Sequence, residues 1–247
     1  MGRYATGDGK VEDACKQEAT RLFYSALNVT EKVKTLIVLA GRPPSMDLLS
    51  WRYEESDRVI AVDGGWQPFQ DSGLCPDVLI GDFDSCPDIN GLRQENPGLE
   101  VIHSIDQENT DFEKALVWTE ANTATQELVV LGGLGQRSDH FITNLLICCK
   151  MNPDWCVVFD DPSEWIRRVT PDTPLSLVGR KGSVLSILPL TPCLGVTSSG
   201  LKWNLSGEEI SLSKKLGQSN FCESDHVEVS CESGNLFVFL SKPIQSD

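Results

Sequence analysis

The chain has 247 residues and carries 36 acidic against 21 basic side chains, for a formal charge of -15. A surface of this charge repels nucleic acid and anionic membranes, so we expect neither as a partner. With 40% hydrophobic residues the composition is that of a globular protein, and the length allows one large domain or two smaller ones.

The nine cysteines include no CxxC pair and no histidine at zinc-ligand spacing, which predicts reduced thiols. The chain shows no charged-then-apolar leader, and its apolar runs are far shorter than the ~20 residues of a membrane span. We therefore expect a cytoplasmic protein whose partners are small molecules.

Residues 1–33 are polar and rich in Lys and Glu, and we expect them to form an arm outside the folded domains. From residue 34 short apolar runs alternate with helix-like stretches. The predicted strands are 35–40, 58–62, 77–80, 99–102, 128–131 and 155–159. Continuous apolar strands separated by helices indicate an open, mostly parallel α/β sheet, which we assign to residues 34–161.

Two helices between these strands are well marked. Thr110 and Glu113 have capping-box spacing, and they precede an apolar helix face that contains Phe112 and Leu116. A second helix is predicted over residues 139–149.

After residue 161 the apolar residues recur with period two, as in 226–231 and 236–240. Glycines such as Gly195 and Gly207 are expected in turns between these runs. The pattern is typical of an antiparallel β-sandwich, which we assign to residues 162–247.

Acidic residues and glycines follow four of the predicted parallel strands. These segments are 63–65, 81–85, 106–111 and 132–139. Ligands of open α/β sheets bind at the carboxyl ends of the strands, so the four segments are expected to meet at one rim.

Asp82 and Asp84 are spaced i, i+2, which points both carboxylates to one side of an extended chain. Two such charges about 4 Å apart repel by roughly 1 kcal/mol in water and about 4 kcal/mol at an effective dielectric of about 20. Oxygen ligands without Cys or His select Mg²⁺, so the cluster predicts a magnesium site. The alternative is a solvated turn.

Gly132, Gly133 and Gly135 follow a predicted strand and precede a helix, so their N–H groups could receive phosphate, with Arg137 as a fork donor. The segment is neither a Walker A loop nor a dinucleotide fingerprint, which disfavours a P-loop kinase and an ordinary dehydrogenase. The alternative is that these glycines serve only a tight turn.

Taken in chain order, the motifs 63–65, 81–85, 110–116, 132–140, 200–203 and 219–220 closely resemble those of the thiamin pyrophosphokinase (thiamine diphosphokinase) family. The resemblance implies a transferase that moves pyrophosphate from ATP to the hydroxyl of thiamin, giving thiamin diphosphate and AMP with Mg²⁺. It also implies a homodimer whose active sites lie between the α/β domain of one subunit and the β domain of the other.

The resemblance implies roles for individual residues. The implied catalytic carboxylates are Asp82, Asp84, Asp111 and Asp139, of which the first three would bind Mg²⁺. The implied nucleotide-binding residues are Asp63, Gly64, Gln107, Thr110, Gly133 and Arg137. The implied thiamin-binding residues are Trp203, Ser219 and Asn220. An aspartate of the cluster is a better candidate for a general base than His103 or His140.

Two positions depart from the pattern of the family. Trp66-Gln67-Pro68 follows the Asp-Gly-Gly motif where small and amide or basic residues are usual, and Ser138 stands where an aromatic is common. Two other functions fit part of the pattern. One is a Mg²⁺-dependent glycosyltransferase that binds a nucleotide sugar through Asp82 and Asp84, and the other is a non-catalytic sensor of thiamin or nucleotide.

Overall fold

The structure is a computed structural model that describes residues 32–70, 72–83, 89–104, 106 and 108–242. The arm expected at residues 1–33 lies almost wholly outside the described residues. Asp84 and Gln107 also lie outside them.

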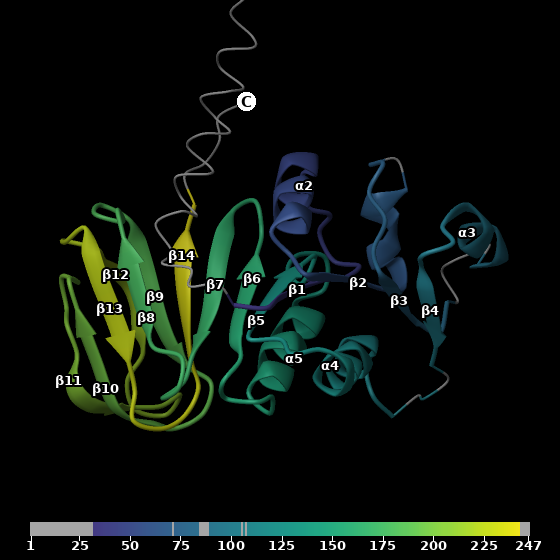
Figure 1. Cartoon of the computed structure of the whole chain (residues 1–247). Helices are drawn as coiled ribbons and strands as arrows, with labels where there is room; N and C mark the ends of the chain where they lie inside the picture. Colours follow the sequence, from purple (N-terminus) through teal and green to yellow (C-terminus); the bar gives the residue numbers. More distant parts are fainter. Residues whose placement is uncertain (1–31, 71, 84–88, 105, 107, 243–247) are drawn as a thin grey trace, which may run out of the picture.

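The largest sheet of the structure has ten strands, in the order β12-β9-β14-β7-β6-β5-β1-β2-β3-β4 (Figure 1). Its parallel strands are β1 (Lys34–Val38), β2 (Arg58–Val62), β3 (Val78–Gly81), β4 (Glu100–His103), β5 (Glu127–Leu131) and β6 (Cys156–Asp160). Its antiparallel strands are β7 (Glu164–Val169), β9 (Val184–Pro189), β12 (Gly217–Phe221) and β14 (Leu236–Ser241). A second, four-stranded sheet contains β8 (Leu175–Val178), β10 (Cys193–Ser199), β11 (Ser206–Ile210) and β13 (His226–Ser230).

The parallel strands are apolar throughout because both faces of the sheet are covered. Leu36 and Ile37 of β1 point to opposite faces, and both are fully buried. One face packs against α4 (Asp111–Asn122) and α5 (Ser138–Cys148). The other packs against α2 (Met46–Glu54), the 3₁₀ helix η1 (Asp63–Phe69) and, farther along, the second sheet. A short helix, α3 (Ile89–Glu95), precedes β4.

The local signals for helices are confirmed. The Thr110 hydroxyl accepts from Glu113 N at 3.2 Å, and the Glu113 carboxylate accepts from Thr110 N at 3.0 Å, which completes the capping box of α4. Phe112 and Leu116 are buried against the sheet. Helix α5 begins one residue earlier than predicted.

The parallel and antiparallel halves belong to one sheet, because β6 pairs antiparallel with β7. The expected domain boundary near residue 161 therefore falls in the tight turn between these strands, where Asp161 N donates to Glu164 O at 3.0 Å. The division into domains stays a prediction.

The expectation that Gly195 and Gly207 lie in turns is wrong: both lie inside strands, at left-handed φ angles of 61° and 73°. The register of β10 with β11 shifts between Cys193 and Val196, and Gly195, with its left-handed φ, lies at this irregularity.

A buried ion network ties the end of the chain to the parallel strands. Arg52 of α2 donates to Asp160 Oδ2 through Nε at 2.8 Å and through Nη2 at 2.6 Å, and Lys242 Nζ donates to Asp160 Oδ1 at 2.5 Å. Asp160 is only 1% exposed. Three segments distant in sequence are thereby held together at the carboxyl end of β6.

Among the residues that the structure describes, no helix combines the length and apolar character needed to cross a bilayer.

Candidate active site

The order of the parallel strands has a switch point between β1 and β5. The chain proceeds outward from β1 to β4 on one side, then crosses back to continue with β5 and β6 on the other. Ligands of open α/β sheets bind at the carboxyl side of such a point. The segments that follow β1, β2, β3 and β5 are therefore the walls of the candidate site.

The segments after β1 and β5 are joined backbone to backbone. Gly41 N donates to Gly132 O at 2.9 Å, and Arg42 N donates to Leu134 O at 2.8 Å. The Gln136 amide also donates to Gly41 O at 3.0 Å. The glycine-rich segment is thus held firmly against the end of β1.

The glycines of the rim have a packing reason to be glycine. A Cβ on Gly65 would lie 1.9 Å from Val38 O, and a Cβ on Gly132 would lie 2.1 Å from Leu39 O. Gly132 also has a left-handed φ of 65°. A Cβ on Gly133 would lie 2.7 Å from the Phe159 ring. Close approach of neighbouring segments therefore accounts for these residues before any ligand is considered.

The acidic residues after β2 and β3 are neighbours. A Cβ on Gly81 would lie 3.3 Å from Asp63 Cβ, so Asp63 adjoins the chain that leads into Asp82. Asp63 has a left-handed φ of 46° at the start of η1. Strain of this kind concentrates at functional sites.

Asp111 is the first residue of α4, and its carboxylate forms an ion pair with Lys114 Nζ at 2.9 Å. The Asp111 side chain is 31% exposed. Within the described part of the chain no three His, Cys, Asp or Glu side chains are grouped as metal ligands. Asp84 lies outside that part, so the predicted grouping of Asp82, Asp84 and Asp111 stays a prediction. The described carboxylates are hard oxygen donors, which suits Mg²⁺.

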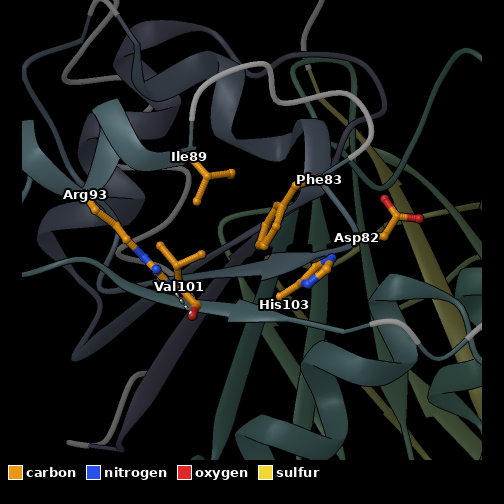
Figure 2. A pocket seen from close by; sticks show the side chains of 6 residues that line it. All are labelled: Asp82, Phe83, Ile89, Arg93, Val101 and His103. Carbon is orange, nitrogen blue, oxygen red and sulfur yellow. Dashed lines mark hydrogen bonds between the residues drawn. The ribbon is translucent and has the colours of Figure 1, made fainter.

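A cavity of about 300 Å³ opens beside Asp82, toward the edge strand β4 (Figure 2). Its described lining is mostly apolar and consists of Asp82, Phe83, Ile89, Arg93, Val101 and His103. The rings of Phe83 and His103 are stacked with centroids 5.6 Å apart. Figure 2 shows Asp82 and Arg93 at opposite ends of this cavity.

Arg137 and Asp139 pair with each other at the start of α5. Arg137 donates through Nε to Asp139 Oδ1 at 3.2 Å and through Nη2 to Oδ2 at 2.6 Å. The hydrogen bonds from Arg137 lower the pKa of the Asp139 carboxyl to about 2. Both side chains are about two-thirds exposed, so the pair is open to a ligand.

Thr110, an expected nucleotide contact near Gln107, has structural partners, and so does the neighbouring Asp106. The Thr110 hydroxyl is engaged in the capping box and also donates to Glu113 Oε2 at 3.1 Å. Asp106 accepts from Asn109 Nδ2 at 2.7 Å and from Glu108 N at 2.8 Å, and these bonds lower its pKa.

The departure at Trp66 has a structural explanation. Trp66 and Phe69 are buried in η1 and belong to the core on the α2 side of the sheet. Trp66 therefore stabilises the segment after β2 by packing into the core on the α2 face of the sheet.

The expected thiamin-site residues come together at the end of β12. Trp203 is 59% exposed, and Lys202 Nζ lies 4.7 Å from its ring centroid. Asn220 is buried and bonds the main chain of Trp203. Ser219 has a left-handed φ of 57°, and its N–H donates to Ser186 Oγ at 2.9 Å.

The two groups of residues lie far apart within one chain. β12 and β3 are separated by eight inter-strand steps in the ten-stranded sheet, and Figure 1 shows them at opposite ends of the molecule. At ~4.8 Å per step this is about 38 Å along the sheet. Both groups nevertheless lie at the same end of the strands. The antiparallel pairings from β6 through β7, β14 and β9 to β12 make β12 run in the same direction as the parallel strands, so its carboxyl end lies on the same side of the sheet as theirs.

The sequence reasoning missed three rim residues: Arg42, Asp161 and Ser163. Arg42 follows the first predicted strand, and the rule that singles out the ends of the other strands applies equally to it. The partnership of Arg42 with Asp161 has no local signal, since the residues are 119 positions apart.

Fold and rim together define an α/β protein with an acid- and glycine-rich ligand site, joined to an antiparallel β-sandwich. Residues 51–159 match the family model described as "Thiamin pyrophosphokinase, catalytic domain", and residues 172–236 match "Thiamin pyrophosphokinase, vitamin B1 binding domain". The chain belongs to the thiamin pyrophosphokinase family.

Individual relatives agree with this assignment. Thiamine pyrophosphokinase 1 of Arabidopsis thaliana is 28% identical over 239 residues, covering 84% of this chain and 86% of that protein. Thiamine pyrophosphokinase of Bacillus subtilis is 27% identical over 194 residues, covering 76% and 89%. The crystal structure of thiamin pyrophosphokinase from Geobacillus thermodenitrificans superimposes with a TM-score of 0.71 at 25% identity, covering 86% of this chain and 99% of that one.

Proposed function

We propose that this chain is a thiamin pyrophosphokinase of the cytoplasm, which transfers the pyrophosphoryl group of ATP to the hydroxyl of thiamin. The observation that carries the proposal is the presence, in a chain of this family, of an acidic switch-point rim and an exposed tryptophan held by a buried amide. The glycosyltransferase and sensor functions are not favoured, since both family models match.

Asp82, Asp84 and Asp111 would hold Mg²⁺ at the rim. When bound, the ion neutralises charge on the polyphosphate and so favours attack on it. Arg137 turns its fork from Asp139 to a phosphate oxygen, because both partners are exposed and a phosphate is an equally suitable acceptor. Thr110, Asp63, Gly64, Gly133 and Gln107 complete the proposed nucleotide contacts.

Trp203 would hold thiamin by its cationic thiazolium. The ammonium of Lys202 already lies over the ring of Trp203, so the ring attracts a cation in this structure. Ser219 and Asn220 border the same loop. The net charge of -15 further favours a cationic substrate.

The proposed reaction is an in-line attack by the thiamin hydroxyl oxygen on the β-phosphorus of ATP. The new O–P bond forms as the bond between the β-phosphorus and the α,β-bridging oxygen breaks, and AMP leaves with that oxygen. The hydroxyl proton passes to an aspartate of the rim. Phosphoryl chemistry of this kind depends mainly on alignment and charge neutralisation.

The separation of the two proposed substrate groups supports a homodimer. Because β12, which carries Asn220, and β3, which leads into Asp82, are about 38 Å apart along the sheet, thiamin at one cannot reach ATP at the other within a single chain. A second copy would supply Trp203 to the rim. Exposed apolar residues on the α5 side of the sheet support an interface there: Ile142, Leu146, Val184 and Phe221.

The product of the reaction tests the proposal. Incubation with ATP, Mg²⁺ and thiamin should give thiamin diphosphate and AMP on chromatography. ADP in place of AMP would exclude pyrophosphoryl transfer. Hydrolysis of a nucleotide sugar would support the glycosyltransferase, and ligand binding without turnover would support the sensor.

Mixing two impaired variants, at thiamin well below KM, tests the shared site. Alone, Asp82→Asn should keep about 1% of the wild-type rate and Trp203→Ala about a tenth. After subunit exchange, a mixed dimer contains one site with both changes and one with neither, so an equal mixture should regain about a quarter of the wild-type activity. A mixture no more active than its components would show that the site does not span two subunits.

A further inference from the structure

Arg42 lies at the switch point, on the segment that follows β1. Its side chain runs along the glycine turn after β5: a Cβ on Gly135 would lie 2.8 Å from Arg42 Cβ and 3.2 Å from its Nε. The backbone of Arg42 is fixed by its bond to Leu134 O. The guanidinium is therefore carried across β5 toward the end of β6.

Asp161 anchors the far end of this side chain. Arg42 Nη1 lies 3.2 Å from Asp161 Oδ1 and 3.5 Å from Ser163 Oγ. The Asp161 carboxylate is 3% exposed, and its Oδ1 also accepts from Ser163 N at 2.9 Å and from Ser163 Oγ at 2.6 Å. The Arg42 side chain itself is 52% exposed. Nη1 of the Arg42 guanidinium is thus anchored to a buried carboxylate, while the side chain as a whole remains half exposed at the rim.

The carboxylate partners of Arg42 and Arg137 differ in burial and in sequence distance. The partner of Arg137 is two residues away, and both members of that pair are about two-thirds exposed. The partner of Arg42 is 119 positions away, in the turn between β6 and β7, and is buried. A guanidinium oriented in advance loses less side-chain entropy when it binds an anion.

We propose that Arg42 binds a phosphate oxygen of the nucleotide at the switch point and that Asp161 orients it for this contact. The inference deepens the proposed function and rests on it. Arg42 approaches the polyphosphate from the side of β1 and β6, whereas the carboxylates Asp63 and Asp82 approach from β2 and β3. The anion would therefore be held from both sides.

Substitution of Arg42 tests the contact. In Arg42→Ala the KM for ATP, and the Kd for ATP and for ADP in calorimetry, should rise about 10- to 100-fold, as for loss of a hydrogen bond to a charged group. The KM for thiamin and the affinity for adenosine should change less than about twofold. Arg42→Lys should fall between, since it keeps the charge and loses the fork. An equal loss for adenosine would overturn the phosphate assignment.

Arg58→Ala is the matched control. Arg58 begins β2 at the opposite edge of the sheet and pairs with Asp77 at 3.8 Å, with both side chains 43% exposed. It should keep the wild-type KM for ATP. A loss in this variant as large as that in Arg42→Ala would mean that the effect is general to surface charge.

The double variant Arg42→Ala/Asp161→Asn separates binding from folding. It removes the anionic partner along with the arginine, so thermal stability should recover relative to Arg42→Ala, while ATP affinity should stay low. Recovery of ATP affinity together with stability would reduce Arg42 to a structural role and overturn the inference. If the wild-type chain neither binds ATP nor forms thiamin diphosphate, the proposed function itself fails. An active wild type with an unaffected Arg42→Ala variant refutes the inference alone.

Discussion

Asn220 holds the main chain of Trp203 from both sides. Its Oδ1 accepts from Trp203 N at 3.1 Å, and its Nδ2 donates to Trp203 O at 2.7 Å. The same Oδ1 accepts from Phe221 N at 2.8 Å. The amide is 5% exposed and its bonds go to backbone, whereas the indole above it is open to solvent.

Substitution of Trp203 should affect binding and not folding. In Trp203→Ala the KM for thiamin should rise about tenfold, the scale of a cation–π contact that is partly desolvated. The melting temperature should stay within about 1 °C, because the ring is largely exposed. Leu212→Ala, a change at another exposed apolar side chain, is the control for both measurements.

Asn220→Ala should affect both. Loss of the buried amide leaves main-chain groups of Trp203 without their partner, which should lower the free energy of unfolding by about 1–3 kcal/mol. The KM for thiamin should also rise, because the loop loses its support. Urea unfolding with initial-rate kinetics checks the pair of effects, and an unchanged unfolding curve would count against this role.

Asp82→Asn should lower kcat by about a hundredfold or more at saturating Mg²⁺, since the amide keeps the shape of the side chain but loses the charge. Circular dichroism and the melting temperature should match those of the wild type. Asp172→Asn, an exposed position in a turn of the β half, should keep full activity. Near-normal rates in Asp82→Asn at limiting Mg²⁺ would remove Asp82 from the proposed metal site.

Gly65→Ala should destabilise the chain by about 3 kcal/mol or more, because the new Cβ would lie 1.9 Å from Val38 O and backbone must shift. Gly98 has no heavy atom within 4 Å of an added Cβ. Gly98→Ala should therefore change stability by less than about 1 kcal/mol, with either sign. Chemical unfolding of the two variants measures the contrast, and equal effects would contradict it.

The Asp139 carboxyl should titrate at about 2 in carboxyl NMR, because Arg137 lowers its pKa. In Arg137→Gln it should titrate near the ordinary value of about 3.9. A depressed folded-state pKa gives stability that is present above the unfolded-state value and lost as pH falls through the folded-state value. The pair should therefore add no pH dependence to stability between about pH 5 and 8.

Asp160→Asn should lower the free energy of unfolding by about 3–5 kcal/mol, since Arg52 and Lys242 would then face each other around a neutral amide in a buried site. Burial also lowers the pKa of Lys242, and Asp160 opposes that shift. Glu209→Gln breaks an exposed pair with Lys214 and should cost at most about 1 kcal/mol. Equal losses in the two variants would contradict the importance of burial.

Features written in neighbouring residues were predicted well. The continuous apolar run at Leu36 predicts a strand buried on both faces, and the spacing of Thr110 and Glu113 predicts the start of α4. Both signals depend on a few consecutive residues.

Features that depend on distant partners were not predicted. The ladder between β6 and β7 leaves no period in the sequence, so the continuity of the parallel and antiparallel strands in one sheet was not predicted. Arg42 is significant only beside Asp161, and Gly65 only beside Val38 O. The placement of Asp84 and Gln107 stays a prediction.

The ladder between β6 and β7 has a mechanical consequence. The parallel strands and the antiparallel strands β7, β14, β9 and β12 form one hydrogen-bonded sheet, so the strand that leads into Asp82 and the strand that carries Asn220 belong to the same sheet. A movement of the β3 side of the sheet relative to the β12 side would break main-chain hydrogen bonds in the middle of the sheet. In the proposed dimer, the docking of two rigid subunits and small side-chain adjustments would therefore bring the two substrates together.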